Sequence, residues 1–317
     1  MATRLFGKLV RSVSSHRAVE TFASHSPLAA GLVHRFVAGE TLDQAAVVVQ
    51  SLNSRGFKAT LDHLGENVAN AEQAHDATAM ALEVLRRIQD AKLDAYLSVK
   101  LTQLGLDVGE HLVLENANRL LDCAAAAGTF IRLDMEGSSY AARILEIFEC
   151  LGRDHVSLGT VLQAYLYRSM DDARRLAASG AAIRLVKGAY DEPAHIAFRR
   201  KRDTDRNYVR IMEYLLGQGV ALAVATHDPA VLGHACEFAR IHDVAPSRFE
   251  FQMLYGVRRD LQESLVRKGY TVRVYVPFGS QWYPYMTRRL AERPANLLSV
   301  GGSIVREWRQ VQCQHQY

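Results

Sequence analysis

The sequence predicts a (β/α)8 barrel of the TIM type with a helical N-terminal segment in front of it. Eight strand-like runs follow one another between residues 57 and 279, and helix-like stretches separate them. Several of the helix-like stretches end in glycine just before the next strand, as helices commonly do (Gly128, Gly180, Gly219 and Gly269). The segment from residue 57 to about 300 is close to the ~250 residues typical of such a barrel. We therefore expect a helical segment at 1–55 and the barrel at 56–317.

Taken in order, each predicted strand is a short apolar or alternating run. The strands fall at residues 57–64, 95–101, 130–136, 156–164, 181–188, 220–228, 249–256 and 271–279, and helix-like stretches fall at 66–90, 111–128, 139–152, 169–180 and 260–269. Several strands are apolar almost throughout, which is typical of a parallel sheet covered by helices. A doubly wound sheet is the alternative. The GQG at 217–219 does not support it, because this segment precedes a strand and lacks the third glycine of the dinucleotide fingerprint.

Composition and charge are those of an ordinary globular protein. The 317 residues are 49% hydrophobic and 23% charged, with a net charge of +4. The most basic segment, FRRKRD at 198–203, is expected to be a solvated helix face, so we expect no nucleic-acid partner. The four cysteines lie far apart and form no CxxC, which indicates a reducing compartment and neither a zinc site nor a disulfide framework.

The first residues allow more than one interpretation. They are basic and rich in serine, with no acid before Glu20, and this composition is also typical of a transit peptide. Leu5, Leu9 and Val13 recur at helical spacing, which favours a folded helix, and an amphipathic helix on a membrane surface is the second interpretation. No apolar run approaches the ~18 residues of a membrane span. We expect a cytoplasmic protein and leave open peripheral contact at the inner face of the membrane.

Polar residues gather at the ends of the predicted strands. Barrel enzymes carry their chemistry at the C-terminal ends of the strands and in the loops that follow. At those ends the sequence has Glu66, Lys100, Asp134, Gln163, Arg184, Lys187, Thr226, His227, Gln252, Leu254 and Tyr275. One such residue alone would be interpreted as half of a structural ion pair. So many at one end of one barrel predict a shared ligand site.

The segment 282–296 adds two adjacent arginines. At about 100° per residue, Tyr285, Arg288, Arg289 and Glu292 share one face of a helix. That face is either solvated, with an i,i+4 pair between Arg288 and Glu292, or a clamp for a carboxylate or phosphate, which guanidinium groups bind bidentately.

The residues by themselves leave the chemistry open. There is no HExxH and the histidines are scattered, so no metal is predicted. Neither a GxSxG elbow nor a P-loop is present. Lys100 at a strand end would suit a Schiff-base lyase, with the paired arginines as its phosphate site.

Five motifs together carry a family resemblance. RLDME at 132–136, IRLVKGAY at 183–190, ATHD at 225–228, FEFQMLYG at 249–256 and YMTRRLAE at 285–292 resemble proline dehydrogenase of the short monofunctional bacterial type. The resemblance covers nearly the whole chain and is weakest over the first ~50 residues. It implies a distorted (β/α)8 barrel that binds FAD without a Rossmann domain. It also implies oxidation of L-proline to Δ1-pyrroline-5-carboxylate, with the electrons passed to a membrane quinone.

The resemblance also implies the substrate residues. The proline carboxylate would lie between Arg288 and Arg289, with Lys100 as a third cation. The side chains that would pack on the proline ring are Tyr275 and Tyr285, helped by Leu254, Ala189 and Tyr190. Asp134 would stand between the substrate and the lysine, and the catalytic residues would be Asp134, Arg184 and Tyr275.

For the cofactor, the resemblance places Arg184 near flavin N5 and Gln163 at the pyrimidine end. The other implied flavin and pyrophosphate residues are Met135, Lys187, Gly188, Ala189, Thr226 and His227. Asp191 stands where family members often have tryptophan, which puts the adenine or ribose contacts there in doubt. Glu66 and Arg288 would form a gate at the entrance, and the alternative is that Glu66 only caps the helix beginning near Asn67.

Other functions remain alternatives beside this one. One is a flavin barrel like methylenetetrahydrofolate reductase, whose fold is related. The second is the Lys100 lyase, and a barrel used only for assembly is the third.

Overall fold

The computed structural model describes residues 33–65 and 68–292, without the side chains of 288–292. The chain divides into two compact units, residues 35–280 and a second unit made of residues 1–34 with 281–317. Each unit is described by itself. The predicted helix through Leu5, Leu9 and Val13 lies outside the described residues, and the predicted boundary after residue 55 stays a prediction.

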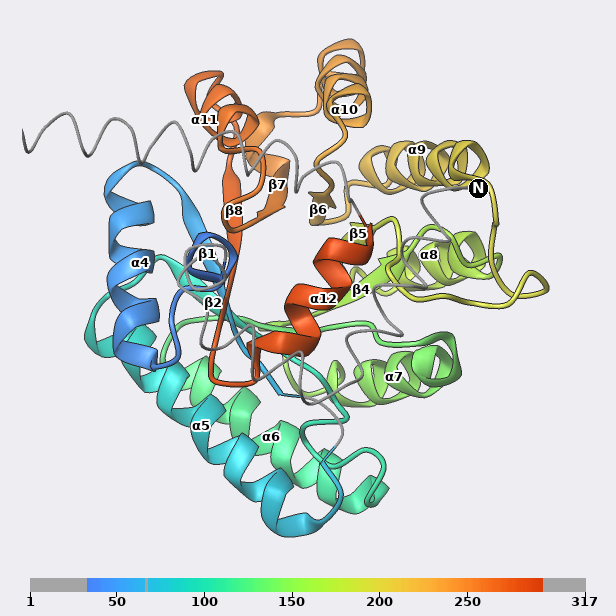
Figure 1. Ribbon diagram of the computed structural model, residues 1–317. Coiled ribbons are helices and arrows are strands. Elements are labelled where there is room, and N and C mark those ends of the chain that lie inside the picture. Colours follow the sequence, from blue (N-terminus) through green and yellow to red (C-terminus); the bar gives the residue numbers. More distant parts are fainter. Residues whose placement is uncertain (1–32, 66–67, 293–317) are drawn as a thin grey trace, which may run out of the picture. The chain divides into compact units, whose positions relative to one another are not determined.

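Residues 35–280 contain a closed barrel of eight parallel strands in chain order, which confirms the predicted fold (Figure 1). The strands are β1 (Lys58–His63), β2 (Ala95–Val99), β3 (Ile131–Leu133), β4 (Leu158–Gln163), β5 (Ala182–Val186), β6 (Leu222–Ala225), β7 (Phe249–Leu254) and β8 (Val272–Phe278). β8 pairs with β1, with Tyr275 opposite Thr60, and this pairing closes the barrel.

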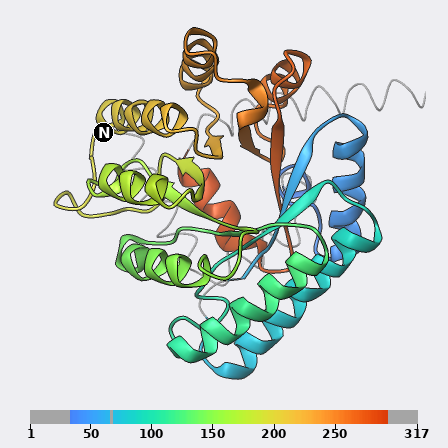
Figure 2. The ribbon, with the colours of Figure 1, turned by 180° about the vertical axis from the view of Figure 1, so that it is seen from behind.

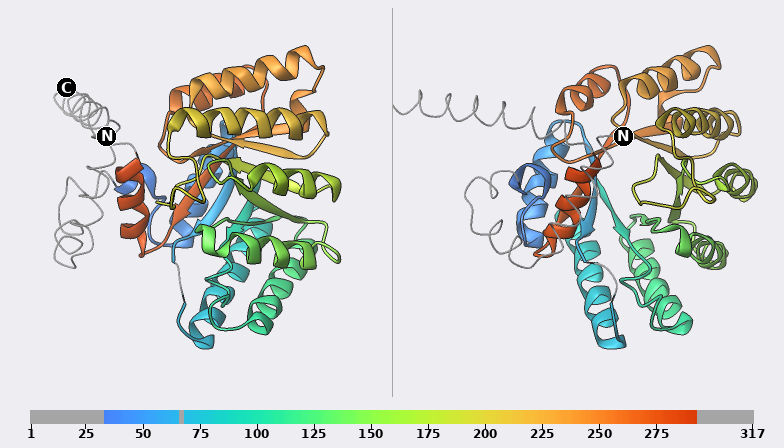
Figure 3. Two further views of the ribbon diagram at one scale, coloured as in Figure 1. Left: turned by 90° about the vertical axis from the view of Figure 1, so that its right-hand side faces the viewer. Right: turned by 45° about the vertical axis from the view of Figure 1, so that its right-hand side comes forward.

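The helices lie around the outside of the strands, as the view from behind also shows (Figure 2). They are α4 (Leu42–Ser54), α5 (Ala71–Asp90), α6 (Glu110–Ala126), α7 (Ser138–Leu151), α8 (Ser169–Ala178), α9 (Lys201–Gly217), α10 (Pro229–Ile241) and α11 (Arg259–Arg267), with a 3-10 turn η1 (Pro246–Arg248). Two further views show the helices spread around the strands (Figure 3). Among the described residues, no helix has both the length and the hydropathy needed to cross a membrane.

The strands are buried on both faces, and the two faces differ in character. One set of alternating positions is apolar and packs beneath the helices, as Leu61, Leu97 and Val274 do. The other set is mostly polar and meets inside the barrel, where side chains from β5, β7 and β8, together with Asp134 just after β3, form hydrogen bonds across the interior. This alternation brings charged groups from distant parts of the sequence together in a space shielded from water.

α4 begins with a capping box. The side chain of Thr41 accepts a hydrogen bond from the backbone N–H of Gln44, and the Gln44 side chain accepts from the backbone N–H of Thr41. Its apolar face, with Leu42, Val49 and Leu52, is buried in the core. This part of the predicted N-terminal segment is therefore helical and packs on the barrel.

α12 (Trp282–Glu292) belongs to the second unit, and its helix confirms the prediction for that segment. Within it, the rings of Trp282 and Tyr283 lie 6.0 Å apart, and the Thr287 hydroxyl donates to the Pro284 carbonyl at 2.9 Å. The side chains of Arg288 and Arg289 are not described, so the clamp stays a prediction.

Candidate functional site

Three residues predicted to be catalytic meet at the C-terminal end of the barrel. Arg184 on β5 donates from Nη1 to Oδ1 of Asp134 at 2.5 Å, and the hydroxyl of Tyr275 on β8 donates to Oδ2 of the same carboxylate at 2.7 Å. The Arg184 guanidinium lies 5.2 Å from the centre of the Tyr275 ring. Strands far apart in sequence thus build one connected group.

The charge states of this group follow from its burial. Burial raises the pKa of Tyr275 well above its ordinary value, and the neighbouring Asp134 raises it further, so Tyr275 is a neutral hydrogen-bond donor. For Arg184, burial acts to lower the pKa, but Tyr96, Asp134 and Tyr275 outweigh burial and raise it. Arg184 is therefore a fixed cation.

Lys100 lies beyond the end of β2 and is paired. Its Nζ lies 3.2 Å from Oδ1 of Asp62, which is buried on β1. Burial raises the pKa of Asp62, and Lys100 opposes that rise. Asp62 is not among the residues that the strand-end pattern predicts for the site. Its period-two spacing from Thr60 in the predicted strand could have placed both side chains inside the barrel.

Gln163 ends β4 and has one side-chain group without a partner. Its Nε2 donates to the backbone carbonyl of Glu136 at 3.2 Å, whereas its buried Oε1 has no hydrogen-bond partner among the described residues. A buried acceptor in this condition usually costs free energy. The atom is available to accept a hydrogen bond from a ligand.

The segment after β5 comes close to neighbouring side chains. Gly188 has φ of +111°, and a Cβ at this position would lie 2.2 Å from Cδ1 of Tyr165. Only glycine combines this backbone conformation with this spacing. The chain therefore has no side chain at one of the positions predicted to contact the flavin.

Lys187 directly precedes this glycine and lies between two carboxylates. Its Nζ lies 2.5 Å from Oδ1 of Asp205 and 2.7 Å from Oδ2 of Asp228, and Lys201 pairs with the same two residues. Burial acts to raise the pKa of Asp228, but the two lysines outweigh it and hold that pKa far below its ordinary value.

Thr226 and His227 follow β6 and connect it to its neighbours. The Thr226 hydroxyl accepts from the backbone N–H of Asp228 at 3.2 Å, and His227 Nε2 accepts from the backbone N–H of Leu254 at 2.9 Å. The histidine therefore ties the end of β6 to the end of β7.

Comparisons with known proteins show the family of this chain. The family model "Proline dehydrogenase" matches residues 45–300. Proline dehydrogenase 2 of Bacillus subtilis is 40% identical over 272 residues, which cover 86% of this chain and 89% of the relative. The chain belongs to the proline dehydrogenase family. The family resemblance seen in the five motifs is thereby confirmed.

Further relatives in sequence and in structure are also proline dehydrogenases or proteins that act in proline utilization by name. Proline dehydrogenase of Deinococcus radiodurans is 40% identical over 303 residues, covering 93% of this chain and 96% of the relative. Among solved structures, proline utilization A from Bdellovibrio bacteriovorus, inactivated by N-propargylglycine, superposes with a TM-score of 0.79 at 26% identity. That match covers 84% of this chain and 33% of the other, so this chain spans about a third of the larger protein.

The remaining residues predicted for the site divide between described and undescribed positions. Met135 is buried just after β3, and Leu254 ends β7. Ala189 and Tyr190 follow Gly188 in the loop after β5 and are half-buried. Tyr285 lies on α12 in the second unit. Glu66 is outside the described residues, so the predicted gate is untested.

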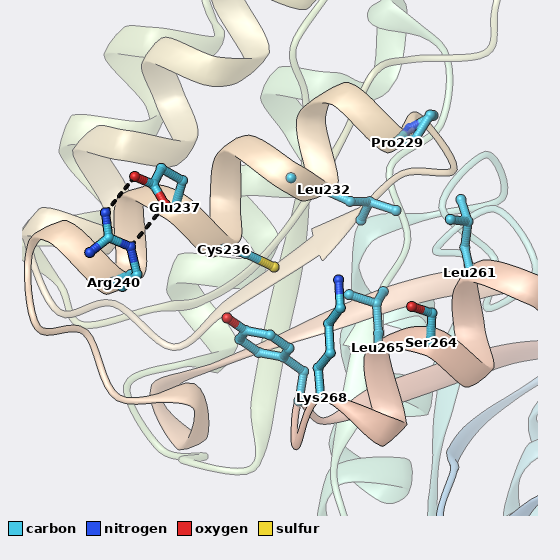
Figure 4. Close-up of a pocket in the computed structure, with 11 residues that line it drawn as sticks. Pro229, Leu232, Cys236, Glu237, Arg240, Leu261, Ser264, Leu265 and Lys268 are labelled. Atoms are coloured by element: carbon cyan, nitrogen blue, oxygen red, sulfur yellow. Dashed lines mark hydrogen bonds and ion pairs between the residues drawn. The ribbon is translucent and has the colours of Figure 1, made fainter.

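A pocket of about 380 Å³ lies elsewhere, on the outer surface between α10 and α11 (Figure 4). Its walls include Cys236, Ser264, Lys268 and Tyr270. None of the residues predicted for the site lines this pocket, so it is separate from the group at the barrel end.

Two aspartates of the site, Asp205 and Asp228, were not predicted. Asp228 belongs to the motif ATHD and begins α10, where its Oδ1 accepts from the backbone N–H of Ala230 at 3.2 Å. An aspartate before a proline-initiated helix is a recognisable N-cap, but its pairing with Lys187 depends on the fold. Asp205 on α9 has no such local signal.

Proposed function

We propose that this protein is an FAD-dependent proline dehydrogenase that oxidises L-proline to Δ1-pyrroline-5-carboxylate and passes the electrons to a membrane quinone. Family membership supports the reaction class. The structural observation that carries the proposal is the group of Asp134, Arg184 and Tyr275, which joins two of the family motifs to β8 at the end of the barrel where such enzymes do chemistry.

The residues present fit a flavin. The free acceptor Oε1 of Gln163 suits a ring N–H donor, and the missing side chain at Gly188 lets the backbone approach a flat ligand. The residues that would hold FAD are Met135, Gln163, Arg184, Lys187, Gly188, Ala189, Thr226 and His227. When bound, FAD supplies the acceptor for the hydride, and the protein supplies orientation and electrostatics.

On the substrate side, cationic side chains would bind the carboxylate of proline, and aromatic side chains would pack on its ring. Arg288, Arg289 and Lys100 would bind the proline carboxylate, and each charge-assisted hydrogen bond contributes about 1.5–3 kcal/mol. Tyr275 and Tyr285 would pack on the ring, with Leu254, Ala189 and Tyr190 beside them. These contacts hold the C5 hydrogen in a reactive position.

The charges of the site favour the reaction. The hydride leaves a carbon next to nitrogen, so the amine must be neutral when it is transferred. A pocket lined by cations favours release of the amine proton. Arg184, held by Asp134 and Gln252, is a fixed positive charge that stabilises negative charge developing beside it.

An anaerobic titration distinguishes this proposal from the alternatives. The purified protein should be yellow, and its flavin absorbance should bleach when L-proline is added. A protein that bleaches only with NADH would be a reductase of the methylenetetrahydrofolate type. A colourless protein that borohydride traps with an aldehyde would be the Lys100 lyase, and either result would overturn the proposal.

A further inference from the structure

Among the described residues, three ion pairs lie on the inward-facing side of the strands, and Arg132 is a further cation there. The pairs join Lys100 to Asp62, Arg184 to Asp134, and Arg273 to Glu250. Arg132 on β3 is 4% exposed and forms no ion pair with any residue that the structure describes. Buried charges in proteins are normally paired, because an uncompensated buried charge is costly.

Arg132 is held in place without a carboxylate. Its Nη1 donates to the backbone carbonyls of Thr160 at 3.1 Å and Ala182 at 2.8 Å. A Cβ at residue 159 would lie 2.6 Å from the same nitrogen, so Gly159 leaves the room that the guanidinium occupies. The guanidinium carbon lies 5.7 Å from the centre of the Tyr96 ring. Tyr96 is thus a close polar neighbour of this cation.

Tyr96 is 5% exposed, and its hydroxyl is surrounded by donors. Nε2 of Gln252 lies 2.6 Å from it, and Nη2 of Arg184 lies 3.4 Å from it. Within the described part of the chain, no acceptor lies within hydrogen-bonding distance of this hydroxyl. A neutral phenol in this position would accept two hydrogen bonds and bury its own O–H without a partner.

The orientation of the Gln252 amide confirms which atoms donate. Its Oε1 accepts from Nε of Arg184 at 2.5 Å, and its Nε2 donates to Oε1 of Glu250 at 2.5 Å. A flipped amide would place its NH2 against a guanidinium and its oxygen against a carboxylate. The group facing Tyr96 is therefore the NH2.

We propose that Tyr96 loses its hydroxyl proton to solvent when the barrel folds, and that the resulting phenolate is the anion that balances Arg132 and anchors Arg184 from below. Loss of this proton resolves both unfavourable features. The phenolate has no O–H that needs an acceptor, and the Arg132 guanidinium gains a negatively charged neighbour.

Charged groups on four other strands face Tyr96 across the barrel interior. They are Arg132 on β3, Arg184 on β5, Glu250 on β7 and Arg273 on β8. The Arg273 guanidinium lies 4.2 Å from the centre of the ring. Burial and Glu250 act to raise the pKa of Tyr96, but the three arginines outweigh them and lower it.

The connection to catalysis rests on the proposed function. If Arg184 lies against the flavin, the phenolate beneath it reduces the positive charge that the flavin experiences. Tyr96 would then be a positioning residue that acts through Arg184, with no contact to substrate.

The test is an ultraviolet titration of the full-length protein with two matched variants. Tyr208 is the control, because it is also fully buried but donates its hydroxyl to the Leu185 carbonyl at 2.8 Å, and burial raises its pKa. Wild type should contain one tyrosinate at neutral pH, whereas tyrosines ordinarily ionise near pH 10. Tyr96→Phe should lose this signal, and Tyr208→Phe should keep it. Identical titrations of wild type and Tyr96→Phe would overturn the proposal.

Two further measurements keep the proposal testable. If Tyr96→Phe fails to fold, infrared spectroscopy provides a second test. Wild type and Tyr208→Phe, both labelled with ring-deuterated tyrosine, should show a tyrosinate band at neutral pH. The absence of this band would overturn the proposal. The band requires neither flavin nor proline, so its outcome is independent of the proposed function. In the holoenzyme, Tyr96→Phe should shift the flavin potential to a more positive value, and an unchanged potential would contradict the role toward Arg184.

Discussion

Asp134 accepts hydrogen bonds from two residues that differ in charge. Arg184 gives it a cation on one oxygen, and Tyr275 gives it a neutral hydroxyl on the other. The carboxylate is thereby fixed in orientation by groups on two strands. The orientation of the Asp134 carboxylate depends on both hydrogen bonds. Removing the Tyr275 hydroxyl should therefore disturb the site while the charges of Asp134 and Arg184 remain.

Tyr275→Phe should lower kcat/KM for L-proline roughly tenfold, which corresponds to about 1.4 kcal/mol, because it removes one hydrogen bond to a charged acceptor. Because the pKa of Tyr275 is raised, the pH dependence of the reaction near neutrality should be the same in wild type and variant. Steady-state kinetics across that range are the measurement. Tyr208→Phe is the control: its hydroxyl binds a backbone carbonyl, so it should lose stability while its kinetics stay near those of wild type.

At the scale of an element, β5 and the segment after it carry more of the site than any neighbouring strand. Arg184, Lys187 and Gly188 all belong to this stretch. Two glycines with positive φ flank the strand: Gly180 precedes it with φ of +72° and open space around it, and Gly188 follows it with φ of +111° against Tyr165. They form a natural matched pair.

Gly188→Ala should sharply reduce the bound flavin per protein, because the added methyl overlaps the Tyr165 ring and displaces the backbone predicted to approach the cofactor. Gly180→Ala should cost only about 1 kcal/mol of conformational strain and keep its flavin. Flavin content and thermal unfolding of both variants are measured together. Equal flavin retention in the two would show that Gly188 has no part in the cofactor site.

The strands and helices could be predicted from the sequence, because hydrophobic periodicity and glycines at helix ends are local signals. Strand ends such as Asp134, Arg184 and Tyr275 were predicted to share one end of the barrel, and they do. Contacts between side chains were not predictable. The bond between Lys100 and Asp62 joins residues 38 positions apart, and the pairing of Lys187 with Asp205 depends on where α9 packs. Such pairings depend on register and helix placement.

At the scale of the whole molecule, two lysines and two aspartates tie three segments together. Lys187 follows β5, Lys201 and Asp205 lie on α9, and Asp228 begins α10. Because the folded pKa of Asp228 is depressed, its stabilisation is present above its unfolded pKa of about 3.9 and is lost as the pH falls through the folded value.

Asp228→Asn should therefore flatten the loss of unfolding free energy below about pH 4, while its side chain still caps α10. Denaturant unfolding at a series of acidic pH values measures this slope. The control is Asp171→Asn, since Asp171 is exposed on α8 and pairs with Arg174 at 2.9 Å. If Asp228→Asn keeps the full acid sensitivity of wild type, this ion group does not stabilise the fold.

The central claim is that this protein, with FAD held at the barrel end, oxidises L-proline and passes the electrons to a quinone. Turnover of L-proline with a soluble quinone analogue, followed by mass spectrometry of the product, tests it most directly. We predict Δ1-pyrroline-5-carboxylate in amounts that match the quinone reduced, and no comparable rate with NAD as the acceptor. A flavin-loaded protein that forms no such product, or that turns over equally well with NAD alone, would contradict the claim.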